Sequence, residues 1–171
     1  LAGLAVPEVQ HACELGFGQG LSLNIHAAGG TVQWQGTDFL PGQALAARHM
    51  AQASGAPLAV TDQAFAEFCA REDLPEFDFV ALHGVWSWVS DANRAVIADF
   101  LRRKLKLGGV VYMGYNILPG WSDTLALREL MQRHTQHLGS SSRGLAGRIE
   151  DALAFAERML AAGGAFAAAH P

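Results

Sequence analysis

Hydrophobic positions along the chain follow two alternating patterns. Short apolar or alternating runs predict strands at residues 11–17, 31–39, 57–63, 77–86 and 109–117. Between them, apolar positions at helical spacing predict helices at residues 20–29, 41–55, 64–73 and 90–109. This alternation predicts an α/β fold: a doubly wound, Rossmann-like, mostly parallel sheet of strand order 3-2-1-4-5, with helices on both faces.

The pattern changes after residue 117. Two helical stretches, at 122–138 and 147–164, flank the small-residue linker "GSSSRG", and no strand pattern follows. We therefore expect an α/β core over residues 1–120 and a C-terminal helical extension over residues 121–171, packed on the core or continuing from it. The chain starts at Leu1 and ends in "AAAHP", which leaves open whether it is a piece of a longer protein.

Composition narrows the classes of partner. The chain has 12 basic and 16 acidic residues and a net charge of −4, so it carries no strong nucleic-acid or membrane signal. Cys13 and Cys69 have neither a metal-ligand spacing nor a disulfide pattern, so we predict no metal and a reducing cytoplasm. No apolar run is long enough to span a bilayer, and the N-terminus has no signal-peptide pattern.

A glycine-rich loop, "ELGFGQG", follows the first predicted strand. In an open α/β sheet ligands bind at this end of the strands, and glycines let the backbone approach a ligand closely. The dinucleotide pattern G-x-G-x-x-G requires a third glycine where Leu21 stands, so this loop departs from it by one residue. An ordinary tight turn is the alternative interpretation.

Glu14, Gly16, Gly18 and Gly20 match the first motif of class I S-adenosylmethionine-dependent methyltransferases, E/D-x-G-x-G-x-G, which this loop resembles. The resemblance implies S-adenosylmethionine as cofactor and S-adenosylhomocysteine as product. It implies that the loop surrounds the amino-acid end of the cofactor, and that Glu14 orders the loop or contacts the cofactor's ammonium. Phe17 replaces a smaller residue of many relatives and leaves the backbone role intact.

Two further acids follow the second and third strands. The resemblance assigns Asp38 to the ribose hydroxyls and places Phe39 against the adenine. It assigns Asp62 to the exocyclic amine of adenine, with backbone contacts from Gln63 and Ala64. Helix N-caps are the alternative roles for Asp38 and Asp62.

The resemblance extends through "FDFVALHGVWSWVSDANR" and "GGVVYMGYNILPGW", which are similar to a bacterial methyltransferase group that often carries a methyltransferase regulatory domain. It covers roughly residues 10 to 125. The methyl acceptor is not identified by it, and the sequence does not predict an oligomeric state.

His83, after the fourth strand, is interpreted as a wall of the methyl-transfer pocket or as a general base, with Tyr115 the second candidate base. Trp86, Trp88 and Trp121 are further candidates for an acceptor pocket. A histidine satisfied by backbone hydrogen bonds, and aromatic residues that pack in the core, are the alternatives. The competing functions are a nicotinamide-dependent oxidoreductase and a non-catalytic module that binds the cofactor or a partner.

Overall fold

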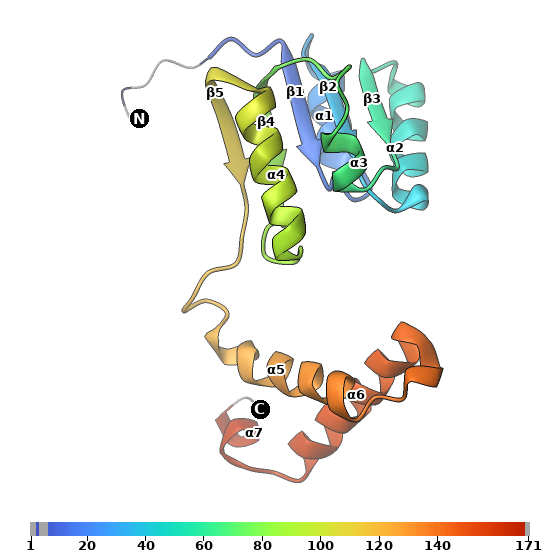
Figure 1. Cartoon of the computed structure of the whole chain (residues 1–171), viewed down its shortest axis with the longest axis vertical. Helices are drawn as coiled ribbons and strands as arrows, with labels where there is room; N and C mark the ends of the chain where they lie inside the picture. Colours follow the sequence, from blue (N-terminus) through green and yellow to red (C-terminus); the bar gives the residue numbers. More distant parts are fainter. Residues whose placement is uncertain (1–2, 4–6, 170–171) are drawn as a thin grey trace. The chain divides into compact units, whose positions relative to one another are not determined.

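The computed structural model describes residue 3 and residues 7–169 of the chain. Its sheet contains β1 (His11–Leu15), β2 (Gln33–Thr37), β3 (Leu58–Thr61), β4 (Phe77–Leu82) and β5 (Leu105–Met113). The helices between them are α1 (Leu21–Ala28), α2 (Pro41–Ser54), α3 (Phe65–Cys69) and α4 (Asp91–Lys104). All neighbouring strands pair in parallel in the order β3-β2-β1-β4-β5, so the predicted fold class is confirmed (Figure 1).

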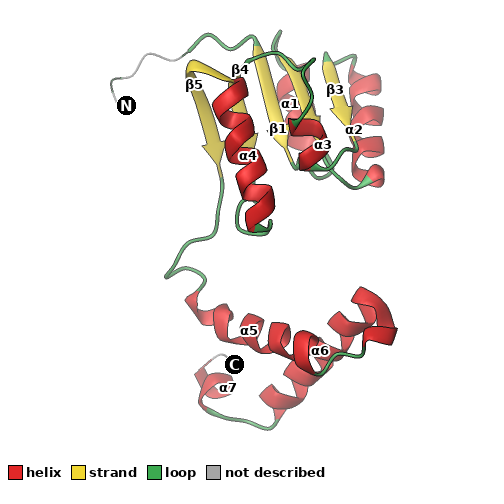
Figure 2. Ribbon diagram, in the orientation of Figure 1, coloured by secondary structure: helices red, strands yellow, loops and turns green. Residues whose placement is uncertain are grey.

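Each face of the sheet has its own apolar core. The α1 and α2 helices lie on one face, and α3 and α4 lie on the other (Figure 2). Strand side chains alternate between the faces, so Cys13 and Leu15 enter the core beneath α3 and α4. Ala12 enters the opposite core, beneath α1 and α2. Glu14 therefore points to the α1 side at the carboxyl end of β1.

The junction between α4 and β5 differs from the prediction. The helical pattern predicted a helix to residue 109, whereas α4 ends at Lys104 and β5 begins at Leu105. Leu105 pairs with Phe77 of β4, and Lys106 forms an ion pair with Asp78 at 2.8 Å. These tertiary contacts override the local helical pattern because they extend β5 along β4.

Asp78 also accepts hydrogen bonds from the backbone N–H groups of Gln10 and His11, at 2.9 and 3.0 Å. The His11 N–H, together with Lys106 and the Gln10 N–H, lowers the pKa of Asp78 to about 2. One ionised side chain thus ties the starts of β1 and β5 together.

A second compact unit follows the sheet. The chain divides into Leu1–Tyr115 and Asn116–Pro171, whereas the sequence placed the boundary after residue 120. The second unit contains α5 (Ser122–His137), a 3-10 turn (Ser141–Arg143), α6 (Gly144–Ala161) and the unpredicted α7 (Ala165–Ala169).

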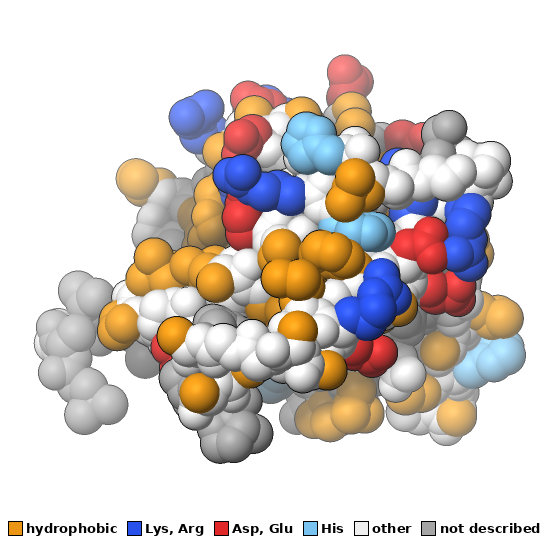
Figure 3. Space-filling view, turned by 90° about the horizontal axis from the view of Figure 1, so that it is seen from below, with side chains coloured by type: hydrophobic (Ala, Val, Ile, Leu, Met, Phe, Trp, Pro, Cys, Tyr) orange, Lys and Arg blue, Asp and Glu red, His pale blue; other side chains and the backbone are white. Residues whose placement is uncertain are grey.

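The helices of the second unit bury few side chains. Ala152 and Ala156 of α6 are buried, whereas α5 has no buried residue. Figure 3 shows hydrophobic side chains at the surface, with charged side chains between them. Within the described residues, no helix combines the length and the apolar character needed to cross a membrane.

Candidate functional site

The glycine loop joins β1 to α1 with three left-handed residues. Gly16, Gly18 and Gly20 have φ angles of 71°, 57° and 74°, a region that side chains other than glycine rarely adopt. The Gly16 N–H donates to the carbonyl of Thr37 at 2.8 Å, and the Gly20 N–H donates to the carbonyl of Phe17 at 2.9 Å. The loop is therefore a defined turn fastened to the end of β2.

The three glycines have different surroundings. A Cβ at Gly16 would lie 2.5 Å from Val85 Cγ2, and one at Gly20 would lie 2.6 Å from the Cβ of Ala47. A Cβ at Gly18 would meet no atom of the described chain within 4 Å. Gly16 and Gly20 thus serve packing within the protein, whereas Gly18 borders open space where a ligand can approach the backbone.

Asn24 anchors the far end of the loop. Its side chain is buried and donates hydrogen bonds from Nδ2 to the Gly20 carbonyl at 2.8 Å and to the Ala47 carbonyl at 3.2 Å. Asn24 was not predicted as a site residue, although its position four residues after Gly20 places it on the helical turn above that glycine.

Asp38 lies at the carboxyl end of β2 and contacts the loop directly. One carboxylate oxygen accepts from the Gly18 N–H at 2.9 Å, and the other accepts from the Leu40 N–H at 3.1 Å. Asp38 is 8% exposed, so the carboxylate is held at the inner wall of the site. This contact brings the predicted ribose acid and the predicted close-approach glycine together.

The predicted adenine residues follow β2 and β3. Phe39 is 67% exposed, so its ring is accessible to a ligand. The carboxylate of Asp62 lies 3.8 Å from the Arg48 guanidinium of α2, and both side chains are partly exposed. Gln63 and Ala64 connect β3 to α3, and the Gln63 carbonyl accepts a hydrogen bond from the hydroxyl of Thr37.

Phe17 contributes only its backbone to this site. Its side chain is buried in the core beneath α1 and α2, where it approaches Gly36. The backbone role expected for Phe17 in cofactor binding stays a prediction.

Glu14 is buried beside the glycine loop. It is 3% exposed, and neither carboxylate oxygen accepts a hydrogen bond from the described residues. Burial in this setting raises its pKa from 4.5 to about 7. The carboxylate is therefore poised to gain from a positively charged group placed beside it.

Glu14 shares a cavity of about 300 Å³ with His83. Its lining residues are Glu14, Ser22, His26, Trp34, Phe79, Ala81, His83 and Tyr112. His83 stacks on Tyr112, with ring centroids 5.8 Å apart and planes 20° apart. The structure thus brings together the acid of the first motif and the candidate base, which the sequence assigned to different strands.

Tyr112, and not Tyr115, is the tyrosine in this cavity. Tyr115 is 58% exposed and is not among the residues that line the cavity. Tyr112 lies on β5 beside Ala81 of β4, and Ala81 is two residues before His83, so its place in the cavity depends on the register between these strands. Trp86 packs against the core beneath α3 and α4, and Trp121 belongs to the second unit.

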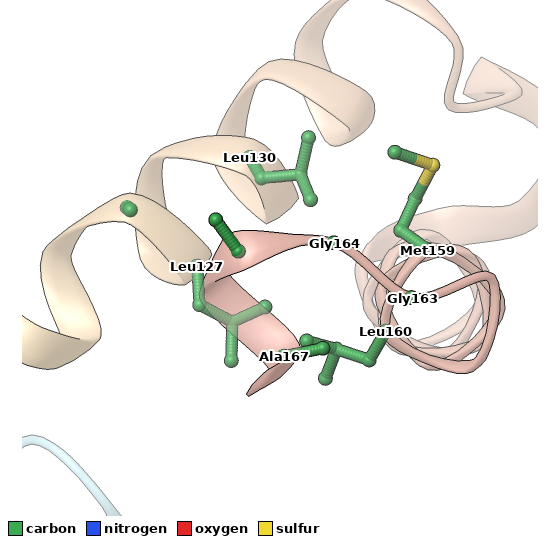
Figure 4. Close-up of a pocket in the computed structure, with 9 residues that line it drawn as sticks. Leu127, Leu130, Met159, Leu160, Gly163, Gly164 and Ala167 are labelled. Atoms are coloured by element: carbon green, nitrogen blue, oxygen red, sulfur yellow. The ribbon is translucent and has the colours of Figure 1, made fainter. Parts of the chain in front are cut away.

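The second unit holds an apolar cavity of about 330 Å³. It is lined by Ala126, Leu127 and Leu130 of α5, by Met159 and Leu160 of α6, and by Gly163, Gly164, Ala165 and Ala167 (Figure 4). No titratable side chain is among the described lining residues. This cavity carries no group for acid–base chemistry, so the candidate site is the one in the sheet unit.

The arrangement of the sheet unit recurs in solved methyltransferase structures. PKMT2 from Rickettsia typhi in complex with AdoHcy is 26% identical, with a TM-score of 0.66 over 81% of this chain and 27% of that chain. The chain has the class I S-adenosylmethionine-dependent methyltransferase fold. The predicted resemblance to class I methyltransferases is confirmed for the fold, whereas membership of the group with a regulatory domain stays a prediction.

The chain is also similar to a second solved methyltransferase and to two uncharacterised proteins. A methyltransferase from Geobacter sulfurreducens in complex with S-adenosyl-L-homocysteine has a TM-score of 0.56 at 18% identity, over 72% of this chain and 50% of that one. An uncharacterised protein of Synechocystis is 41% identical over 150 residues, which are 86% of this chain and 29% of the relative. An uncharacterised protein of Rickettsia prowazekii is 31% identical over 142 residues, 79% of this chain and 25% of the relative.

The chain matches only part of each of these relatives. The chain spans between a quarter and a third of the length of the curated relatives it matches. No protein-family model matches the chain.

Proposed function

We propose that this chain is the cofactor-binding part of an S-adenosylmethionine-dependent methyltransferase. The observation that carries the proposal is the set of three acids, Glu14, Asp38 and Asp62, at the carboxyl ends of three adjacent strands around the glycine loop. The R. typhi and G. sulfurreducens proteins, which share the fold, were solved with the demethylated cofactor bound.

The residues present fit this cofactor. Open space at Gly18 accommodates a ligand against the backbone, and the Asp38 carboxylate beside it is a paired acceptor for vicinal hydroxyls. Glu14 has no partner among the described residues and is buried, which suits an ammonium group that restores its charge. Phe39 and Asp62 remain exposed for the adenine.

The cofactor supplies a methyl group on a sulfonium, which is a good leaving group. The chain's task is then to align an acceptor and to exclude water from it. His83 is exposed at the carboxyl end of β4, and we assign to it the removal of a proton from an acceptor that needs a base. The imidazole stacks on Tyr112, and both side chains line the cavity that Glu14 also lines.

A nicotinamide-dependent oxidoreductase is the competing function. The dinucleotide-binding motif of such enzymes requires a third glycine for close packing of helix on strand. Leu21, the first residue of α1, occupies that position here. Calorimetric titration with S-adenosylhomocysteine and with NAD separates the two. We expect saturable binding of S-adenosylhomocysteine and none of NAD; binding of NAD alone would overturn the proposal.

The activity and partners of the whole protein are proposals too, because the chain spans only part of its relatives. We infer transfer to an unidentified acceptor, and assays of methyl transfer onto an acceptor library distinguish it from a non-catalytic binding module. A cytoplasmic location stays a prediction from cysteine usage; both Cys13 and Cys69 are buried free thiols.

A further inference from the structure

A pair of buried hydroxyl groups lies beneath the adenine end of the proposed site. Thr37 is the last residue of β2 and is fully buried. Its hydroxyl donates to the Gln63 carbonyl at 2.5 Å and accepts from the Thr61 hydroxyl at 3.2 Å. Two neighbouring strand ends are thus linked by a short chain of hydrogen bonds that ends on the backbone after β3.

These hydrogen bonds fix the orientation of one peptide group. The peptide between Gln63 and Ala64 is trans and planar, so its C=O and N–H point in opposite directions. Thr37 draws the Gln63 carbonyl inward, toward the sheet. The Ala64 N–H therefore points outward, and no carbonyl of the described residues accepts from it.

We propose that Thr37 is a positioning residue that selects the adenine base by holding the Gln63–Ala64 peptide with its N–H facing the cofactor. The inference rests on the proposed function. An outward N–H pairs with a ring nitrogen that accepts a hydrogen bond, as N1 of adenine does, and disfavours a ring nitrogen that carries a proton. Asp62, the neighbouring residue, then accepts from the exocyclic amine of the same base.

Loss of the Thr37 hydroxyl has a defined consequence. Without it, the Gln63 carbonyl has no partner from β2, and the peptide is free to rotate. A net hydrogen bond of this kind contributes enough to change affinity by about 3- to 10-fold. The change falls on base recognition rather than on the ribose, because Asp38 keeps its own contacts with Gly18 and Leu40.

The test compares two ligands on matched variants. Affinities for S-adenosylhomocysteine and for S-inosylhomocysteine, whose base carries a carbonyl and a protonated N1, are measured by calorimetry. Thr37→Val removes the hydroxyl at nearly constant volume, and Thr37→Ser keeps it. Thr135→Val is the control, because the Thr135 hydroxyl also donates to a backbone carbonyl, at 2.9 Å, but lies in the second unit.

We expect the wild type and Thr135→Val to prefer the adenine ligand equally. Thr37→Val is expected to lose about 3- to 10-fold in affinity for that ligand, with little change for the inosine ligand, and Thr37→Ser to recover it. Thr61→Val, which removes the donor to Thr37, is expected to shift the preference in the same direction by less. This variant carries the test if Thr37→Val does not fold.

An unchanged preference in folded Thr37→Val, or in Thr61→Val where Thr37→Val does not fold, would overturn the inference. So would an equal loss in Thr37→Val and Thr37→Ser. If the wild type binds neither ligand, the proposed function itself fails. The two failures are therefore distinguishable by the wild-type titration alone.

Discussion

The two halves of the sheet's carboxyl edge differ in how their polar groups are held. At β2 and β3, Asp38 and Thr37 are buried and bonded to the backbone of other segments. At β4 and β5, His83 and Tyr112 are exposed and contact each other by stacking. The first half is organised before a ligand arrives, as recognition of an invariant cofactor requires. The second half is open, which suits an acceptor that enters from outside.

Gly18 gives the largest expected effect on the organised half. Gly18→Val is expected to reduce binding of S-adenosylhomocysteine below detection by calorimetry, because the side chain fills the open space beside Asp38 and strains a backbone with φ of 57°. Gly55→Val is the matched control, since Gly55 also has positive φ and open space but caps α2 at the other end. Wild-type affinity for S-adenosylhomocysteine in a folded Gly18→Val variant would show that the loop is an ordinary tight turn with no role in binding.

His83 gives the next largest effect, on the open half. If His83 is the base, His83→Ala is expected to slow methyl transfer by about 10²–10⁴-fold, with affinity for S-adenosylhomocysteine unchanged. The measurement is transfer of labelled methyl to an acceptor found by library screening. A small loss of rate, or a loss of cofactor affinity in its place, would make His83 a pocket wall.

Asp38 tests the ribose contact. Asp38→Ala is expected to weaken the binding of S-adenosylhomocysteine by about 10- to 100-fold, because a charge-assisted hydrogen bond contributes about 1.5–3 kcal/mol. Thermal melts of the variant separate this loss from unfolding. Wild-type affinity in a folded Asp38→Ala protein would remove the residue from the site.

Glu14 is expected to have a smaller effect on ligand affinity, and this effect depends on pH. Its pKa of about 7 in the free protein falls when a ligand ammonium lies beside it, so binding is expected to release a proton. Affinity for S-adenosylhomocysteine then rises by at most about tenfold per pH unit up to pH 7 and levels off above it. Titrations across pH test this, and Glu14→Gln is expected to flatten the profile.

The raised pKa of Glu14 also affects the stability of the unliganded protein, which is expected to fall as pH rises. Because burial raises the folded-state pKa above the ordinary value of 4.5, the contribution of Glu14 to the free energy of unfolding is present below pH 4.5 and is lost as pH rises through about 7. Denaturation of the unliganded chain at pH 5 and pH 8 measures it. A pH dependence equal in wild type and Glu14→Gln would contradict the assignment of this shift to Glu14.

The sequence predicted the α/β class and the positions of the acids after their strands because both depend on local patterns: strand–helix alternation, and single residues placed after a strand. The sheet order followed from the doubly wound topology that this alternation favours. The start of β5 at Leu105 was not predicted, because pairing with Phe77 and the ion pair of Lys106 with Asp78 join segments distant in sequence. Tyr112 was missed in favour of Tyr115 for a related reason. Its contact with His83 depends on the register between β4 and β5.

The structure of the chain bound to S-adenosylhomocysteine tests the central claim most directly. The account predicts the ribose on the Asp38 carboxylate, the amino-acid end along Gly16–Gly18 beside Glu14, and the adenine between Phe39 and Asp62. A ligand in the apolar cavity around Leu127 and Met159, or one that leaves Asp38 and Gly18 without contact, would contradict it.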